Sequence, residues 1–254
     1  MHPGHSLLTD MSEFKDHFSQ QASEYAQFRP HYPQKLFEEI AALCNNKDAL
    51  DIGTGNGQCA ISLAAYFQNI TAIDPSERQI EQAMIHPSVT YRVAQAEQTG
   101  CEDESMDLIT AAQALHWFDH QRFFSEVFRV LRPGGLFVAW GYGHHFVDGC
   151  QDILEHYYHE VVGPYWPPER ESIEARYSDI EQPDWLQAVA EPKVEMEADW
   201  NRNQLLGYIS TWSAAQKYME KNGKDPLPLL ESALSDCWAS PEEVRRVRWP
   251  FFFV

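Results

Sequence analysis

The chain has 254 residues, 44% of them hydrophobic and 13% aromatic, and its formal net charge at pH 7 is -19. A chain of this length buries one substantial core and does not require two independent domains. No apolar run approaches the roughly 20 residues that cross a bilayer. Clustered lysine and arginine bind nucleic acid and anionic membrane surfaces, so the surplus of acid argues against both as partners.

The cysteines indicate a reducing compartment. They are odd in number, scattered and nowhere in a C-x-x-C pair, which predicts neither a disulfide framework nor a metal site. They are Cys44, Cys59, Cys101, Cys150 and Cys237. The start of the chain lacks the basic region and apolar middle of a secretory signal. We therefore expect a cytoplasmic protein without a metal.

The first element in chain order is a stiff segment at residues 18–33. Its Arg29 precedes Pro30 directly, and Pro33 follows shortly after. Proline restricts its own backbone and that of the residue before it. The direction of the Arg29 side chain is therefore set locally.

Short apolar runs then alternate with helical patterns, which indicates a parallel sheet with helices on both faces. The expected strands are residues 48–52, 69–73, 89–93, 107–111 and 136–141. The helical spacing places Leu36, Phe37, Ile40 and Leu43 on one face, and Phe124, Val127, Phe128 and Leu131 on another. In open sheets of this kind ligands bind outside the carboxyl ends of the strands.

A glycine turn follows the first strand. Asp51 closes the strand, and Gly53, Gly55 and Gly57 stand at alternate positions. Glycine removes Cβ atoms from the turn, so a ligand can lie directly against the backbone amides. The G-x-G-x-x-G fingerprint of dinucleotide sites would need a small residue where Gln58 stands, and a fixed carboxylate would repel phosphates. The pattern favours a cationic or zwitterionic ligand.

The second strand ends in another acid, Asp74, 23 residues after Asp51. This is close to the roughly 20-residue interval at which an acidic side chain reaches both hydroxyls of a ribose. The two acids and the glycines together predict a nucleoside pocket without phosphates.

This series resembles the class I S-adenosylmethionine-dependent methyltransferases. Residues 94–97 follow the third strand like the segment that holds adenine in that family, and residues 129–135 resemble the helix end and turn before the fifth strand. Gln95 stands where many relatives carry Asp, and its carbonyl can also accept a hydrogen bond from the adenine amino group. The resemblance implies a Rossmann-like, doubly wound α/β fold with a mostly parallel seven-stranded sheet and an antiparallel last strand.

The resemblance also implies S-adenosyl-L-methionine as cofactor and a small-molecule acceptor. The cofactor-binding residues that it implies are Arg29, Asp51, Gly53, Thr54, Gly55, Gly57, Asp74, Pro75, Gln79, Gln95, Ala96, Glu97 and Gln113.

A finer resemblance concerns the trans-aconitate methyltransferase-like branch. The pattern F-x-x-x-A-x-x-Y-x-x-x-R-P-x-Y-P runs from Phe18 to Pro33, and residues 116–119 and 208–213 also match that branch. By this resemblance the N-terminal segment folds over the site as a helical lid, and Arg29 pairs with the cofactor carboxylate through two parallel hydrogen bonds. The other interpretation is that Arg29 anchors the lid to a surface acid.

The later chain adds an insertion to this core. We expect a single domain over residues 1–254, divided into a lid at 1–33, a cofactor-binding core at 34–143, a helical insertion at 144–190 and a C-terminal part at 191–254. Within these, the patterns predict a helix at 144–162 broken at 163–168, renewed alternation at 194–200, a helix at 204–221 and a final strand at 244–254.

His116 and Trp117 follow the fourth strand by a few residues, where an acceptor would meet the reactive methyl group. With Arg29 they are the candidate catalytic residues, although a histidine in this place can also be structural. A carboxylate acceptor is ionised at neutral pH, so Arg29, His116 or Arg202 would only position it. A phenol or carbon acid must lose a proton, and His116 would then be the base.

Aromatic side chains near the site have two interpretations. Packing is the expected role of Trp140 and Tyr142. The aromatic group of the insertion is expected to form core with one or two pocket members. This group is Tyr157, Tyr158, Tyr165 and Trp166.

Three functions stay open, and the sequence leaves the oligomeric state open as well. The first is O-methylation of an organic acid carboxylate, and the second is C- or O-methylation of an aromatic or quinone precursor. The third is a protein that binds the cofactor without methyl transfer. A nicotinamide dehydrogenase is disfavoured by Gln58 and Asp51.

Overall fold

The computed structural model describes residues 29–254, so most of the predicted lid lies outside the described residues. The first half of this region alternates strands and helices. Its elements are α2 (Gln34–Ala41), β1 (Asp48–Ile52), α3 (Gln58–Leu63), β2 (Asn69–Asp74), α4 (Glu77–Glu81), β3 (Val89–Val93), β4 (Met106–Ala112), η1 (Leu115–Trp117), α5 (His120–Val130) and β5 (Leu131–Tyr142).

The second half is mostly helical. Its elements are β6 (Phe146–Val147), α6 (Gln151–His156), the π-helix η2 (Tyr157–Val161), η3 (Gly163–Tyr165), α7 (Arg170–Glu174), β7 (Met196–Trp200), α8 (Arg202–Ser210), α9 (Ser213–Asn222), α10 (Leu227–Cys237), β8 (Arg245–Trp249) and β9 (Phe251–Phe253).

The central sheet has the order β3-β2-β1-β4-β5-β9. All its strands are parallel except β9, which pairs antiparallel with β5 at the edge. The strand order reverses between β1 and β4, and a crevice opens at such a reversal outside the carboxyl ends of the strands. The predicted α/β fold with a mostly parallel sheet and an antiparallel last strand is confirmed.

The predicted number of seven strands is wrong among the described residues, because the central sheet has six. The alternating segment near residue 200 is a strand, but β7 pairs with β8 in a separate antiparallel sheet of order β6-β8-β7. The predicted final strand is also divided. Pro250 separates β8 from β9, so the chain passes from the small sheet into the central one.

Alternate residues of the central strands face two different cores. Ala49 packs with the apolar residues of α2 and α3, and Leu50 packs with those of α5 and with Tyr177 beyond α7. This two-residue period is the geometry of a strand buried on both faces. A third core joins the small sheet to α6, η2, α8 and α10.

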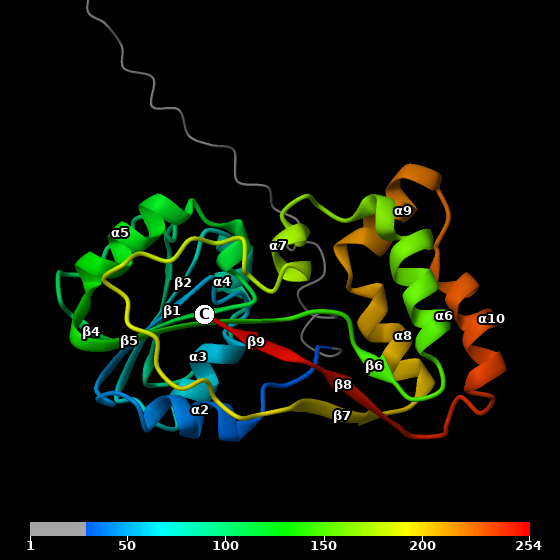
Figure 1. The fold of residues 1–254 in the computed structure, drawn as a ribbon, viewed down its shortest axis with the longest axis horizontal. Coiled ribbons are helices and arrows are strands. Elements are labelled where there is room, and N and C mark those ends of the chain that lie inside the picture. The colour runs from blue at the N-terminus through cyan, green and yellow to red at the C-terminus, as the bar shows by residue number, and fades with distance from the viewer. Residues whose placement is uncertain (1–28) are drawn as a thin grey trace, which may run out of the picture.

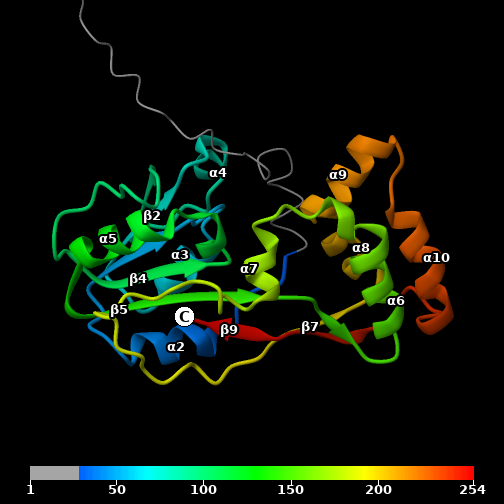
Figure 2. The same ribbon diagram turned by 45° about the horizontal axis from the view of Figure 1, so that its top comes forward.

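We call the helices α6, η2, η3, α8, α9 and α10, with sheet β6-β8-β7, the helical part. Figure 1 shows it beside the central sheet, with α7 between the two, and the turned view of Figure 2 keeps this arrangement. Two segments of chain connect the central sheet with the helical part. β5 and β9 belong to the central sheet, and β6 and β8 continue the same two segments of chain into the helical part.

Some helix predictions need correction. The helix expected over 144–162 begins only at Gln151, and the one expected over 204–221 is interrupted between α8 and α9. Leu43 lies beyond the end of α2 and is exposed, and Phe128 is 62% exposed rather than buried. Phe128 instead packs edge-on against Trp185, with ring centroids 5.2 Å apart.

A disulfide joins Cys150 to Cys237, 87 residues apart in sequence. It links the residue before α6 to the last residue of α10. The expectation of no disulfide is therefore wrong, because two cysteines without any motif meet through the packing of the helical part. The cytoplasmic location, which depended on it, stays a prediction.

Within residues 29–254 no helix is both long and apolar enough to span a bilayer. In the same part of the chain no group of His, Cys, Asp or Glu side chains could hold a metal ion.

Candidate active site

The glycine turn after β1 depends on the absence of side chains. Gly53, Gly55 and Gly57 all have positive φ, at 69°, 55° and 88°. A Cβ on Gly53 would lie 2.6 Å from the Cβ of Ala114, and one on Gly57 would lie 2.2 Å from the hydroxyl oxygen of Tyr91. These two glycines are therefore required both by the backbone conformation and by their neighbours.

Gly55 faces open space instead. A Cβ there would have only Oε1 of Gln79 within 4 Å, at 4.0 Å. Its backbone N–H donates to Oδ2 of Asp74 at 2.9 Å, and Oδ1 of the same carboxylate accepts from the N–H of Ser76 at 2.9 Å. The carboxylate of Asp74 thus lies beside the uncovered side of the turn.

Asp51 supports the turn from within. It is fully buried, and its carboxylate accepts hydrogen bonds from the hydroxyls of Thr54 at 2.6 Å and Thr110 at 2.8 Å. Burial raises its pKa, against hydrogen bonds that lower it. The structure therefore presents no exposed atom of Asp51 to a ligand, although its predicted contact with the cofactor stays a prediction.

The end of β3 contributes the segment predicted to hold adenine. Gln95 is exposed, Ala96 is buried, and Oε1 of Glu97 accepts a hydrogen bond from the backbone N–H of Asp119 at 2.8 Å. The backbone N–H of Ala94 donates to the carbonyl of Asp74 at 3.2 Å. The predicted residues on β2 and β3 are thus brought to one edge of the sheet.

Gln113 fastens the end of β4 to β5. Its φ is 56°, and its backbone N–H donates to the carbonyl of Trp140 at 2.8 Å. Its amide donates to the carbonyl of Tyr142 at 2.9 Å and accepts from the N–H of that residue at 3.0 Å. The side chain is therefore held by two hydrogen bonds at the crevice.

A small cavity of about 60 Å³ lies between this edge of the sheet and the helical part. Its walls are mostly aromatic. They are formed by Arg29, Gln113, His116, Trp117, Tyr142, Gly143, His144, Tyr158, Trp166, Pro167, Arg170, Tyr208, Trp212 and Ser213. Among these described residues no aspartate or glutamate lines the cavity, and two arginines do.

Both guanidiniums are held by aromatic side chains. Arg29 donates to the hydroxyl of Tyr142 at 3.2 Å and lies over the ring of Tyr208, 5.7 Å from its centroid. Arg170 lies over the ring of Trp166, 4.7 Å from its centroid. Cation–π contacts of this kind strengthen when they are shielded from water.

Arg170 also has polar partners on α7 and η2. Its Nε donates to the hydroxyl of Tyr158 at 3.0 Å and to Glu174 at 3.2 Å, and the hydroxyl of Tyr158 donates to Glu174. The sequence reasoning missed Arg170. The available signal was its place four residues after Trp166 and four before Glu174, within the aromatic insertion.

His116 contacts the cavity with an uncharged ring. Its Nδ1 lies 3.0 Å from the hydroxyl of Tyr177. Burial, with smaller contributions from Arg170 and His120, lowers its pKa to about 3. At neutral pH the imidazole therefore carries no charge.

The predicted residues thus fall into two groups. The cofactor residues of β1, β2 and β3 gather at one stretch of the sheet edge, and all three candidate catalytic residues line the cavity, together with Gln113. Of the aromatic group in the insertion, Tyr158 and Trp166 line the cavity. Arg202 does not, because its guanidinium donates to Ser235 at 3.0 Å and to the carbonyl of Trp238 at 2.8 Å.

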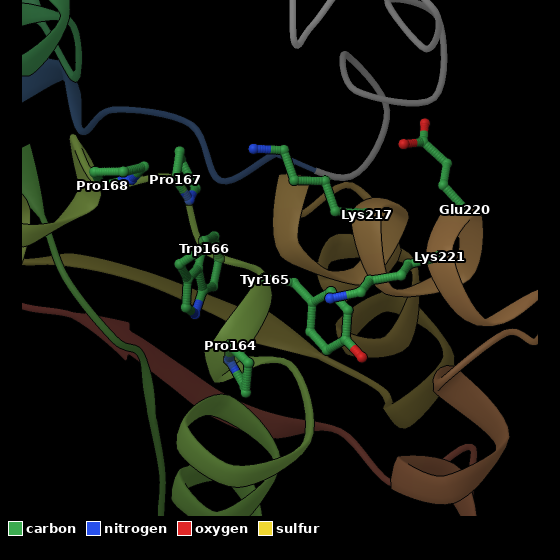
Figure 3. A pocket seen from close by; sticks show the side chains of 8 residues that line it. All are labelled: Pro164, Tyr165, Trp166, Pro167, Pro168, Lys217, Glu220 and Lys221. Atoms are coloured by element: carbon green, nitrogen blue, oxygen red, sulfur yellow. The ribbon is translucent and has the colours of Figure 1, made fainter.

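A second hollow of about 430 Å³ lies on the outer side of Trp166 and Pro167, which line both spaces. Figure 3 shows Lys217 of α9 extending toward Pro167, and Lys221 beside Tyr165. The Nζ atom of Lys221 lies 5.5 Å from the centroid of the Tyr165 ring. The lining of the outer hollow therefore carries two lysines and one acid, Glu220.

Comparisons with known proteins agree on one class. A family model described as a methyltransferase domain matches residues 50–139. A protein of Dictyostelium discoideum that is named as a methyltransferase is 34% identical over 235 residues, which are 90% of this chain and 89% of that protein. A Saccharomyces cerevisiae protein that is named as an S-adenosylmethionine-dependent methyltransferase is 30% identical over 149 residues, 54% of this chain and 51% of that protein.

A solved structure from Anaeromyxobacter dehalogenans, described as a type II methyltransferase, has a TM-score of 0.83 and 42% sequence identity. The match covers 89% of this chain and 96% of that one. It therefore includes the helical part as well as the central sheet.

Proposed function

The chain belongs to the class I S-adenosylmethionine-dependent methyltransferases, and from that premise we propose that it methylates a small organic acid on a carboxylate oxygen. The proposal includes the finer resemblance to the trans-aconitate methyltransferase-like branch. It also keeps the division into lid, core, insertion and C-terminal part, and the exclusion of nucleic acid and membrane partners, which depends on the net charge.

The residues at the sheet edge fit the cofactor. The uncovered side of Gly55 leaves room for a ligand against the backbone, and Asp74 beside it can accept both hydroxyls of a ribose. We propose that Gln95, Ala96 and Glu97 hold the adenine and that Arg29 pairs with the carboxylate. Thr54, Pro75, Gln79 and Gln113 complete the proposed contacts, and Asp51 holds the turn.

One observation carries the choice of acceptor: no carboxylate of the described residues lines the cavity, and beside Arg29, which would pair with the cofactor, a second guanidinium, that of Arg170, does. In a chain with a net charge of -19, such a cavity runs against the overall composition. Opposite unit charges 4 Å apart attract by about 4 kcal/mol at an effective dielectric constant of about 20. The cavity therefore favours an anionic acceptor over a neutral or cationic one.

The chain's own residues would act by positioning. When bound, S-adenosylmethionine supplies a methyl group already activated on a sulfonium. A carboxylate is ionised at neutral pH, so no residue has to remove a proton from it. Arg170 would align the acceptor, and the rings of Trp117, Trp166 and Trp212 would exclude water from the approach.

The second candidate function is methylation of an aromatic ring or phenol, which the aromatic walls favour. Such an acceptor must lose a proton, and the candidate base is His116 of η1, which lines the cavity together with His144. A base whose pKa lies at about 3 removes protons poorly at neutral pH. This favours the carboxylate over the phenol.

Radiolabelled methyl transfer tests the proposal. The protein would be given labelled S-adenosylmethionine with panels of mono-, di- and tricarboxylic acids, phenols and quinols, while calorimetry with S-adenosylhomocysteine confirms a competent cofactor site. We expect label in an alkali-labile ester of an acid. Label only in phenols or ring carbons would overturn the choice of acceptor. Cofactor binding without transfer to any acceptor would support the non-catalytic reading.

A further inference from the structure

The backbone at the end of α7 is strained in a way that serves one side chain. Arg176 and Tyr177 have φ values of 55° and 58°, a region that costs residues other than glycine roughly 1–2 kcal/mol each. The N–H of Tyr177 donates to the carbonyl of Ser172 at 2.8 Å. Two strained residues in succession turn the Tyr177 side chain inward, where only 1% of it is exposed.

The ring of Tyr177 is fixed on one side by packing. It meets Phe252 of β9 edge-on, with centroids 5.1 Å apart. On the other side its hydroxyl lies 3.0 Å from Nδ1 of His116, and the two rings are stacked with centroids 6.1 Å apart. The strained turn thus brings a residue of the insertion into contact with His116.

The direction of this hydrogen bond follows from the burial of the phenol. Burial raises the pKa of Tyr177, so the hydroxyl keeps its hydrogen at neutral pH. A buried hydroxyl hydrogen needs an acceptor, and Nδ1 of His116 is the hydrogen-bond partner that the described residues offer it. The acceptor for this hydrogen is Nδ1 of His116, so the remaining proton of the neutral imidazole is on Nε2.

We infer that Tyr177 is a positioning residue that fixes His116 in the Nε2–H form, so that His116 donates a hydrogen bond to an anionic oxygen of the acceptor. This inference rests on the proposed function. His116 lines the same cavity as Arg29 and Arg170, and among the described residues no hydrogen-bond partner for Nε2 is present. The cavity then holds a neutral donor beside two cationic ones.

The groups around His116 agree with this role. Burial keeps the ring neutral, and Arg170 and His120, which face it, add to the effect. A positively charged imidazole would be repelled by the guanidinium of Arg170. A neutral ring with Nε2–H has no lone pair on the cavity side, so it cannot take a proton from an acceptor there.

The direct test is the tautomer of His116 in the whole protein with S-adenosylhomocysteine bound. Long-range proton–nitrogen correlation of nitrogen-labelled histidine distinguishes Nε2–H from Nδ1–H, and the resonance missing in His116→Gln assigns the residue. We expect Nε2–H, with Nδ1 accepting a hydrogen bond. An Nδ1–H form would overturn the inference. This measurement needs no acceptor, so its result stands apart from the methyl-transfer assay.

Kinetics of variants test the role. The amide of Gln can donate where Nε2–H does, so His116→Gln should keep more turnover than His116→Met. Met has no donor, and the KM of His116→Met for the acid should therefore rise at least about tenfold. Equal, near-complete loss in both variants would indicate a base and overturn the inference.

Tyr177→Phe should move the Nδ1 resonance toward that of an unbonded nitrogen. It should also raise the KM for the acid several-fold while the affinity for S-adenosylhomocysteine and kcat change little. Tyr66→Phe, which loses only a surface hydrogen bond to Glu38, is the matched control. An unmoved Nδ1 resonance or an unchanged KM in Tyr177→Phe would overturn the assignment of Tyr177.

Discussion

Replacement of Arg170 by methionine tests the charge of the cavity. Methionine keeps much of the side-chain volume and the contact with Trp166 while it removes the cation. A guanidinium about 4 Å from a carboxylate contributes about 4 kcal/mol at an effective dielectric constant of about 20. Glu174, whose Oε1 lies 3.2 Å from Nε, offsets part of the positive charge. Taking half of the attraction, we expect a loss of about 2 kcal/mol, or roughly 30-fold in kcat/KM.

The assay is initial-rate methyl transfer to the best acid at two salt concentrations, with the affinity for S-adenosylhomocysteine measured in parallel. Arg122→Met is the matched control, because Arg122 is exposed on α5 and does not line the cavity. A kcat/KM for Arg170→Met within twofold of the control, with cofactor affinity intact, would refute the charge argument.

Three further outcomes follow from the fold and the site. Gly57→Ala should lower the free energy of unfolding by more than Gly134→Ala in chemical denaturation, because both glycines have positive φ but only the first has a neighbour within 4 Å. Burial lowers the pKa of His116 to about 3 from an unfolded value of about 6.5, so the folded state binds fewer protons between these values. The free energy of unfolding should fall as pH falls through that window, and less steeply in His116→Gln; an equal slope would contradict the buried neutral ring. Cys237→Ala should lower the free energy of unfolding by about 4 kcal/mol without reductant and change it little with reductant, because it removes the disulfide. The control Cys44→Ala, at a free cysteine, should have the same effect under both conditions. The measurement is Tm with and without dithiothreitol.

The strand ends could be predicted from the sequence because parallel strands buried on both faces appear as short continuous apolar runs. β1 and β3 begin and end at the predicted residues. The glycine turn could be predicted for a similar reason, because a backbone with repeated positive φ requires glycines at those positions. Both features depend on local chemistry.

The acceptor cavity could not be predicted in the same way. Arg170 reaches it from the insertion, and Tyr177 reaches His116 in its wall. The placement of both depends on how α7 packs between the sheet and the helical part. Tyr177 also needs a left-handed backbone that its residue type does not favour, so no local rule indicates it. Arg202 was also expected to position an acceptor, but tertiary packing directs its guanidinium to Ser235 and Trp238 instead.

The predictions for the last strands and for the cysteines were wrong for the same physical reason. Alternation in β7 correctly indicated a strand, but alternation does not say which strand it pairs with. The spacing of Cys150 and Cys237 carries no motif, and only the packing of α6 against α10 brings them together.

The edge of the central sheet has a consequence for biosynthesis. β5 has β4 on one side, and on its other side, among the described residues, β9 pairs with its end at residues 140–142. β9 comes after all the elements of the helical part. During translation this edge of β5 therefore stays unpaired until the whole helical part has been synthesised. Unpaired strand edges of this kind can pair with other chains. The nascent protein should therefore depend on chaperones until β9 is made. Removal of residues 251–253 should favour aggregation, while the cofactor affinity of the protein that stays folded should change little.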